Sequence, residues 1–235
     1  SRRTTDLLFE LRRILKQRNA MLDAVDVDET QLTLWTEAFI TVSAELASRR
    51  ARFLKTLLPL IQQSYEQVSG KAEEINVVYE PDGLENVDVA TETVESIAAA
   101  LRETASRLAF RERQRRSTLF GAQRDELSLR IDGGIVKESA SQGQHKSFLV
   151  ALKLAECTIL HDVRGERPVV LLDDVFSELD RSRCERTMEL VLAMGMQCFV
   201  TTTEGDTIAS MVPAGTDARR IILERGHIVD MREAA

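Results

Sequence analysis

Apolar residues near the start of the chain recur at helical spacing. In a first predicted helix they are Leu8, Leu11, Leu15 and Leu22, with Ile14 and Met21 in the adjacent row. In a second helix, which is expected to begin at about Glu29, they are Trp35, Phe39, Val42, Leu46, Phe53 and Leu57. Pro59 is expected to kink or end this helix, giving a rod of about 30 residues and roughly 45 Å. Because residues 23–28 interrupt the pattern, the two helices predict an antiparallel hairpin, an arm.

The pattern changes after this arm. Residues 75–80 predict a strand before a turn, residues 90–116 predict a third helix, and Gly121 marks another break. The alternating residues 127–131 run into Asp132-Gly133-Gly134, a strong hairpin signal. A helix from about 143 to 160 is apolar almost all round, which predicts burial against a sheet. Its apolar residues are Phe148, Leu149, Leu152, Leu154 and Ile159.

Strands and helices alternate in the last third of the chain. A strand opened by Pro168 is followed by a helix at about 181–193 and an apolar strand at 198–203. A closing hairpin is predicted from residues 221–224 and 227–229, joined at Arg225-Gly226. This order predicts an α/β fold, a mainly parallel sheet with an antiparallel edge. The division into domains is predicted as a helical arm over residues 1–116 and an α/β domain over residues 117–235.

Two carboxylates follow the apolar strand at 169–172. At the end of such a strand Asp173 is expected to hold Mg²⁺ beside a triphosphate, directly or through water. Asp174 would then orient or deprotonate the attacking water. The alternative is that both are solvated or helix-capping aspartates at the end of an ordinary buried strand.

The segment Ser141-Gln142-Gly143-Gln144 precedes the apolar helix. A helix amino terminus attracts phosphate, glycine allows close approach of the backbone, and Ser and Gln can donate hydrogen bonds. All four are therefore candidate phosphate-binding residues. The same Ser-x-x-Gln spacing forms a capping box in any helix, and taken alone this second interpretation is favoured.

Two further polar positions are candidates. Asp180 is expected to cap the helix that begins at Arg181, or to reach toward the site of a partner subunit. A hydroxyl of the run Thr201-Thr202-Thr203, at a strand end, would contact a γ-phosphate or a water, although threonine is common in strands for its shape alone.

Composition narrows the classes of protein. Apolar residues make up 43% of the chain, enough for a core, while charges interrupt every run that approaches the length of a membrane span. Three separated cysteines without a Cys-x-x-Cys pair argue against a disulfide framework and fit a reducing cytoplasm. The net charge of −7 argues against nucleic-acid binding by bulk charge. Arginine-rich clusters at 12–18, 49–55 and 107–116 are interpreted as solvated helix faces, with local basic surfaces as the alternative.

The order of these motifs resembles the second lobe of ATP-binding-cassette ATPase heads, and within that superfamily the RecF proteins of bacterial recombinational repair. The segments that carry the resemblance are Leu15-Lys16-Gln17-Arg18-Asn19-Ala20, Ala140-Ser141-Gln142-Gly143-Gln144, Ala151-Leu152-Lys153-Leu154-Ala155-Glu156 and Leu171-Leu172-Asp173-Asp174-Val175-Phe176-Ser177-Glu178-Leu179-Asp180. The run Asp-Asp-Val-Phe-Ser-Glu-Leu-Asp is specific to RecF, since SMC heads usually have Asp-Glu there.

The resemblance implies roles for individual residues. Ser141, Gly143 and Gln144 resemble the signature motif, which contacts the γ-phosphate held by the opposite subunit. Asp173 matches the Walker B magnesium acid, and Asp174 stands where many relatives have a catalytic Glu, consistent with slow hydrolysis. Asp180 matches the acid of the D-loop at the dimer interface, and Thr203 stands where many relatives have a switch His.

The resemblance also implies a function. RecF-like proteins form head-to-head homodimers around ATP and Mg²⁺, bind duplex DNA near single-strand gaps, and help RecR and RecO to load RecA. The chain has no Gly-x-x-x-x-Gly-Lys-Ser/Thr loop, so we expect a carboxyl-terminal part of such a protein that binds ATP poorly by itself. The alternatives are a non-catalytic interaction module and an SMC-like chromosome-organising head.

Overall fold

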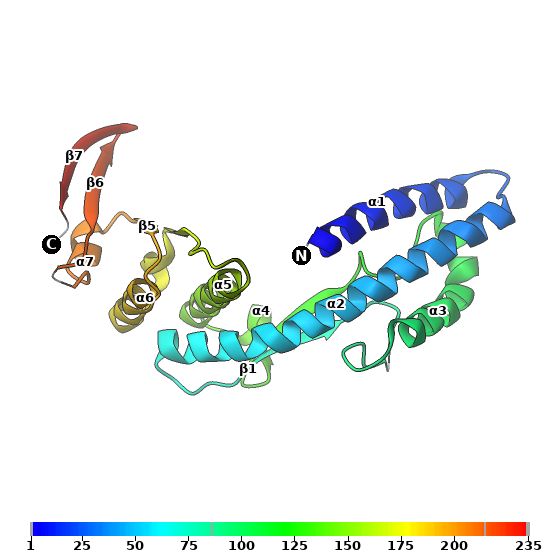
Figure 1. The fold of residues 1–235 in the computed structure, drawn as a ribbon, viewed down its shortest axis with the longest axis horizontal. Coiled ribbons are helices and arrows are strands. Elements are labelled where there is room, and N and C mark those ends of the chain that lie inside the picture. The colour runs from blue at the N-terminus through cyan, green and yellow to red at the C-terminus, as the bar shows by residue number, and fades with distance from the viewer. Residues whose placement is uncertain (1, 86, 214, 234–235) are drawn as a thin grey trace. The chain divides into compact units, whose positions relative to one another are not determined.

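The computed structural model describes residues 2–85, 87–213 and 215–233 (Figure 1). Its packing separates two compact units, each built from two segments of the chain. Unit one comprises the residues up to Thr56 and Val77–Ser128, and unit two comprises Leu57–Asn76 and the residues from Leu129 onward. The predicted single boundary after residue 116 stays a prediction, because each of the two units combines residues from before and after that point.

An antiparallel helix pair forms much of unit one (Figure 1). Helix α1 spans Arg2–Asp23 and α2 spans Glu29–Ser69. Arg3 pairs with Glu45 at 2.9 Å, whereas Arg18, later in α1, donates to Thr36, earlier in α2, at 3.0 Å. The two helices therefore run in opposite directions, and the predicted hairpin is confirmed.

The buried face of this pair differs in detail from the prediction. Leu7 lies in the core and Leu8 is 41% exposed. Leu11 of the predicted row is buried, and so is Ile14 of the adjacent row, so the buried face runs between the two rows. Phe53, predicted on the buried stripe of α2, is exposed. Trp35 is half-buried and packs against the core of the unit, as its position on the stripe indicates.

Pro59 does not end α2, which continues for 41 residues in all. Proline removes one helical hydrogen bond and crowds the preceding turn. In α2 the turns after it bury Ile61, Tyr65 and Val68 completely, and this packing offsets the local cost. The expected end of the helix at Pro59 is therefore wrong.

The core of unit one is completed by α3, Val94–Arg115, which the sequence predicted with slightly wider bounds. Thr93 caps its start by accepting a hydrogen bond from the backbone of Ser96. Phe39 and Phe120 meet edge to face, with ring centroids 5.3 Å apart. Gly121 follows with φ +101°, and a Cβ there would lie 2.5 Å from Phe39, so the break needs glycine for both reasons.

Three strands form the first sheet, in the order β1, β2, β3. Strand β1 spans Ile75–Glu80, β2 spans Glu126–Ile131 and β3 spans Gly134–Ile135. The β2–β3 turn places Asp132 and Gly133 at positive φ, as a tight hairpin requires. The predicted hairpin is confirmed.

Alternating helices and strands make up most of unit two. After the short α4, Val136–Ser139, the order is α5, Gln142–Arg164; β4, Val170–Asp173; the 3₁₀ helix η1, Val175–Glu178; α6, Arg181–Ala193; β5, Cys198–Thr201; and α7, Gly205–Ala209. Strands β4 and β5 pair in parallel, with Val170 opposite Cys198 and Asp173 opposite Thr201. The predicted α/β fold is confirmed, although the parallel sheet has only these two strands among the described residues.

Burial in unit two is more one-sided than predicted. In β4, Val170 and Leu172 are buried while Leu171 is 72% exposed, so only one face of this strand lies in the core. Helix α5 buries Phe148 and Leu154, but Leu149 is exposed. The predicted burial of this strand therefore holds for one face only, and the helix that is apolar almost all round leaves part of its apolar surface exposed.

The closing hairpin consists of β6, Arg219–Glu224, and β7, His227–Glu233. The two strands pair antiparallel around Arg225 and Gly226, both at positive φ. Within the described residues this hairpin is a sheet of its own, so its predicted place at the edge of the parallel sheet is wrong. No helix in the described ranges combines the length and the apolar character that a membrane span needs.

Candidate functional site

Strand β4 ends in an exposed carboxylate. The parallel register places Asp173 directly opposite Thr201 of β5, and the Thr201 hydroxyl donates a hydrogen bond to Asp173 Oδ1. Carboxyl ends of parallel strands are where α/β folds bind ligands, because backbone and side chains open to solvent there. The arrangement offers one carboxylate with an oriented hydroxyl beside it, a donor set that suits Mg²⁺ bound to phosphates.

Asp174 lies in the turn that follows. Its φ of +49° is in the left-handed region, which aspartate tolerates better than most residues. Its backbone N–H donates to Thr201, to the carbonyl oxygen at 3.2 Å and to the hydroxyl at 3.1 Å. Its carbonyl accepts a hydrogen bond from Ser177 Oγ at 3.0 Å. These contacts hold the turn, and they leave the Asp174 side chain exposed on the same strand end as Asp173.

Ser141 caps helix α5. Its hydroxyl accepts from the backbone N–H of Gln144 at 3.2 Å, and the Gln144 side chain accepts from the backbone N–H of Ser141 at 2.9 Å. The capping box is therefore present, and Gln144 also donates to Glu73 at 3.1 Å. Ser141 is exposed, and a hydroxyl that accepts one hydrogen bond keeps its own proton to donate. Capping and a phosphate contact are thus compatible, and the phosphate roles of Ser141, Gln142, Gly143 and Gln144 stay predictions.

The buried guanidinium of Arg183 lies close to Gly143. A Cβ at this position would lie 3.0 Å from Arg183 Nη1, so a side chain here would displace the arginine. The same nitrogen donates to Ser147 Oγ at 3.1 Å, and Ser147 in turn donates to the carbonyl of Gly143 at 2.8 Å. The glycine therefore serves the packing of α5 against α6, whatever ligand approaches its backbone.

Asp180 caps α6. One of its oxygens accepts from the backbone N–H of Arg183 at 2.9 Å and from Ser182 Oγ at 2.7 Å. The other forms an ion pair with Arg183 Nε at 3.2 Å. The hydrogen bonds from the Ser182 hydroxyl and the Arg183 backbone lower the pKa of Asp180, because they stabilise the carboxylate form. The capping interpretation is observed, and a role at a subunit interface stays a prediction.

The predicted residues thus fall into two groups within unit two. Thr201 forms hydrogen bonds with both Asp173 and Asp174. Arg183 forms a hydrogen bond with α5 and an ion pair with Asp180. Thr203, the predicted hydroxyl, lies two residues beyond the end of β5, so the sequence analysis placed the strand end too late. Thr201 was missed as a separate candidate, although the strand pairing identifies it.

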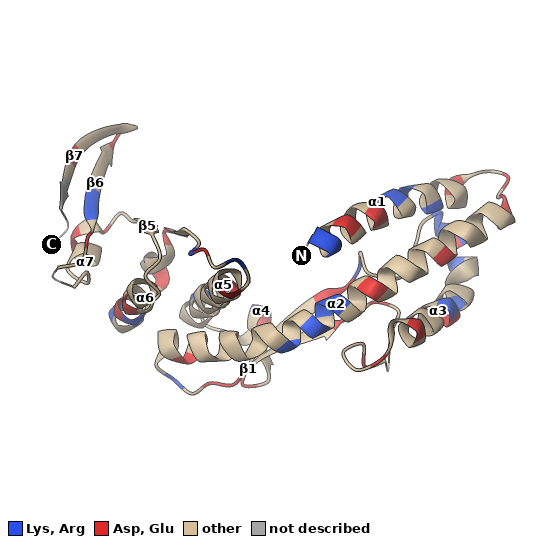
Figure 2. Ribbon diagram, viewed as in Figure 1, with Lys and Arg blue, Asp and Glu red and all other residues tan. Residues whose placement is uncertain are grey.

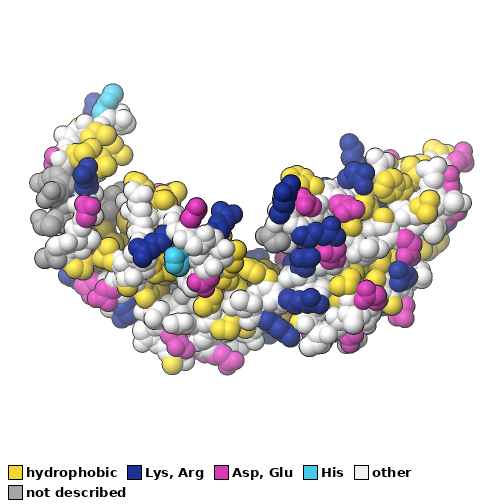
Figure 3. All heavy atoms as spheres, in the orientation of Figure 1, with side chains coloured by type: hydrophobic (Ala, Val, Ile, Leu, Met, Phe, Trp, Pro, Cys, Tyr) yellow, Lys and Arg dark blue, Asp and Glu magenta, His cyan; other side chains and the backbone are white. Residues whose placement is uncertain are grey.

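Some basic residues of the helical arm pair with acids, and Figure 2 shows Lys and Arg interspersed with Asp and Glu along α1 and α2. Arg49 contacts Glu45, and Arg50 contacts Asp125 in a short ion pair. Figure 3 shows Lys and Arg side chains over α1 and α2 with Asp and Glu side chains among them. These pairs favour solvated faces for Arg49 and Arg50, and the alternative of a local basic surface stays open for the clusters.

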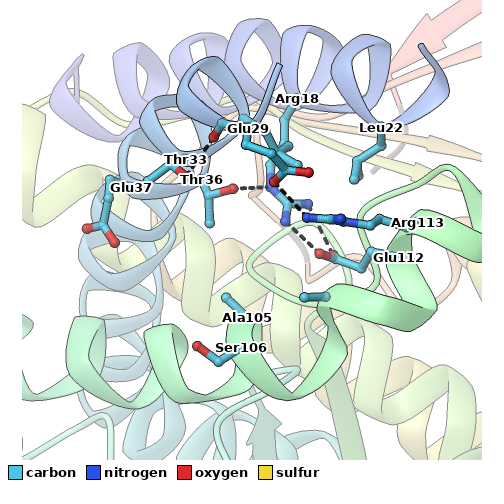
Figure 4. Close-up of a pocket in the computed structure, with 12 residues that line it drawn as sticks. Arg18, Leu22, Glu29, Thr33, Thr36, Glu37, Ala105, Ser106, Glu112 and Arg113 are labelled. Atoms are coloured by element: carbon cyan, nitrogen blue, oxygen red, sulfur yellow. Dashed lines mark hydrogen bonds and ion pairs between the residues drawn. The ribbon is translucent and has the colours of Figure 1, made fainter. Parts of the chain in front are cut away.

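Unit one also contains a cavity of about 220 Å³ among α1, α2 and α3 (Figure 4). Its wall includes Arg18 and Glu112, whose side chains point toward one another and form two hydrogen bonds. The rest of its lining mixes apolar, hydroxyl and charged residues, such as Leu22, Thr33 and Glu37. None of the predicted site residues lies in this wall.

Several known proteins with similar sequences are named "DNA replication and repair protein RecF". The RecF of Geobacter sulfurreducens is 35% identical over 202 residues, 86% of this chain and 54% of that protein. The RecF of Lactobacillus delbrueckii subsp. bulgaricus is 32% identical over 228 residues, 95% of this chain and 58% of that protein. The chain therefore spans about half the length of the curated relatives that it matches.

Solved structures give the same family. A structure of the recombination mediator protein RecF with ATP, described as part of the RecFOR pathway, superposes with a TM-score of 0.75 and 26% identity. The superposition covers 87% of this chain and 54% of that one. A second RecF structure, with ATPrS, superposes with a TM-score of 0.74. A scan against models of known protein families finds no match. Over the part of those proteins that it matches, the chain belongs to the RecF family.

Proposed function

We propose that this chain works as the second head lobe and arm of a RecF protein, an ATP-dependent mediator of recombinational DNA repair. In the full-length protein, two copies dimerise head to head on binding ATP and Mg²⁺ and engage duplex DNA at single-strand gaps. RecR and RecO act with it there to load RecA. The observation that carries the proposal is the exposed Asp173 carboxylate beside Thr201, at the carboxyl end of a parallel strand.

Each candidate residue has a role in this proposal. Asp173 would hold Mg²⁺, which when bound neutralises phosphate charge during hydrolysis. Thr201 orients the Asp173 carboxylate, and Asp174 orients or deprotonates the attacking water from its turn. Ser141 and the α5 amino terminus present a hydroxyl and backbone amides to the γ-phosphate held by the partner. Asp180 and Thr203 lie toward the same dimer interface.

A second candidate is a non-catalytic interaction module. The observation that favours it is that Ser141 and Asp180 both act as helix caps, so their positions are explained without a nucleotide. Exposed apolar side chains on the outward face of the parallel sheet, Leu171 and Phe199, are also consistent with a docking role. The SMC-like alternative is not supported, because the similar proteins are named RecF.

Replacing Asp173 by Asn in the full-length protein distinguishes the two candidates. The change keeps the shape and removes the charge that Mg²⁺ requires, so Mg²⁺-dependent ATP turnover should fall by roughly tenfold or more. The matched control is Asp162→Asn, an exposed acid on α5 outside the proposed site, which should turn over ATP normally. Equal turnover in both variants and the unchanged protein would exclude the metal role and favour the interaction module.

A further inference from the structure

Arg183 is a buried cation between the start of α5 and the loop that contains Asp180, the Asp180 loop. It lies in the first turn of α6, and only 8% of its surface is exposed. Its Nε pairs with Asp180 at 3.2 Å, while its Nη1 donates to Ser147 in α5 at 3.1 Å. A single rigid guanidinium therefore contacts the Asp180 loop and the first turns of α5 at the same time.

The contact extends to the backbone of the α5 start. Ser147 donates to the carbonyl of Gly143, and a Cβ built on Gly143 would lie only 3.0 Å from Arg183 Nη1. A second, longer ion pair of 3.7 Å joins Lys146 of α5 to Glu178, two residues before Asp180. Movement of the Asp180 loop would therefore break buried hydrogen bonds of the Gly143 turn, or carry that turn with it.

We propose that Arg183 is a positioning residue that couples the Asp180 loop to the Ser141–Gln144 segment. This inference rests on the proposed function, in which the first segment belongs to the dimer interface and the second contacts the partner's nucleotide. Through Arg183 the two contacts are made or lost together. Arg183 itself touches no nucleotide, and its effect is on ATP-dependent dimerisation rather than on nucleotide binding by the monomer.

The test uses full-length RecF protein and measures two constants by separate methods. Nucleotide affinity of the monomer is measured by titration at low protein concentration, and the ATP-dependent dimerisation constant by sedimentation. Arg183→Met keeps the apolar stem and removes all donors. It should weaken dimerisation by about tenfold while nucleotide affinity stays within about twofold. Arg183→Lys restores the charge without the fork and should recover part of the loss.

Arg186→Met is the matched control, because it separates coupling from simple packing. Arg186 lies one turn further along α6 and donates to the backbone carbonyls of Val68 and Ser69 at the end of α2, with a longer contact of 3.3 Å to Ser182 and, among the described residues, no hydrogen bond to α5. Its loss should lower the melting temperature without a selective effect on dimerisation. Equal dimerisation constants for the Arg183 and Arg186 variants would overturn the inference.

Ser147→Ala covers the case in which Arg183→Met fails to fold. Alanine is favourable in a helix, so the fold is retained while the Arg183–Ser147–Gly143 chain of hydrogen bonds is cut. Dimerisation should weaken by about threefold or more, and normal dimerisation would refute the coupling. If unchanged protein does not dimerise with ATP, the proposed function and this inference fall together. If the unchanged protein dimerises with ATP and the Arg183 and Ser147 variants dimerise equally well, the inference alone falls.

Discussion

At the scale of single residues, buried arginines organise this chain. Arg18 is 3% exposed and makes hydrogen bonds to both Glu112 oxygens, at 3.1 and 2.6 Å. Thr118 accepts a third at 2.7 Å, and the rings of Phe39 and Phe120 lie 5.6 and 5.5 Å from the guanidinium. The sequence analysis placed Arg18 in a cluster of solvated or DNA-facing charges. It was wrong for this residue, because charge patterning does not show which cation finds a carboxylate inside the core.

Glu112→Gln should destabilise unit one by about 3 kcal/mol, because it leaves the buried Arg18 charge without its counter-charge. The matched control is Glu29→Gln, which removes the exposed ion pair with Arg113 and should cost less than about 1 kcal/mol. Urea unfolding of both variants measures the difference. A cost for Glu112→Gln no larger than for Glu29→Gln would contradict a stabilising role of the buried Arg18–Glu112 ion pair.

The Asp180 cap predicts a pH dependence at the acid end of the scale. Its folded-state pKa is lowered, so the stability it contributes is present above the unfolded pKa of about 3.9 and is lost as the pH falls through the folded value. Ser182→Ala removes the first cause of the lowered pKa. The Asp180 pKa should then rise. Relative to the unchanged protein, the Ser182→Ala variant should lose more of its free energy of unfolding at pH 6 than at pH 2. An NMR titration of the carboxyl group that gives the same pKa in both proteins would contradict this.

At the scale of elements, local signals predicted most of the fold. Helix α6 begins and ends at the predicted residues, and the turns at Asp132-Gly133 and Arg225-Gly226 were identified from residues that tolerate positive φ. The predictions that failed concern contacts between segments that are far apart in the sequence. The spacing in α1 does not show that Leu7 is buried and Leu8 exposed, and the sequence does not show that Thr201, rather than Thr203, pairs with Asp173. Burial of Arg183 has no signature in the sequence either, because an Arg three residues after a capping Asp is usually exposed.

Pro59→Ala should stabilise the chain, because Pro59 is exposed in the interior of a continuous helix. Proline costs about 3 kcal/mol relative to alanine in a helix interior, and its restriction of the unfolded chain returns about 0.4–1 kcal/mol. A gain of about 2–2.6 kcal/mol in the free energy of unfolding is therefore expected by chemical denaturation. A loss of stability would show that the helix around Pro59 is adapted to the ring.

At the scale of the whole molecule, the proposed function requires a nucleotide site that is built from more than this chain. The chain spans about half of the RecF proteins that it matches. The proposed metal ligand Asp173 lies at the end of β4 and the exposed Ser141 at the start of α5, each held by its own set of hydrogen bonds. Under the proposed function the two groups act on different nucleotides, the first on that of its own subunit and the second on that of the partner. ATP-dependent dimerisation is then the property that connects them.

The most direct measurement compares Ser141→Asp with Ser141→Asn in the full-length protein. Both residues are strong helix caps, so α5 should be equally stable in the two variants, and they differ in one negative charge at the proposed γ-phosphate contact. Sedimentation with ATP should show dimers for the Asn variant and mainly monomers for the Asp variant, with monomer ATP affinity alike in both. Equal dimerisation of the two variants, or loss of monomer ATP binding by the Asp variant, would contradict the account.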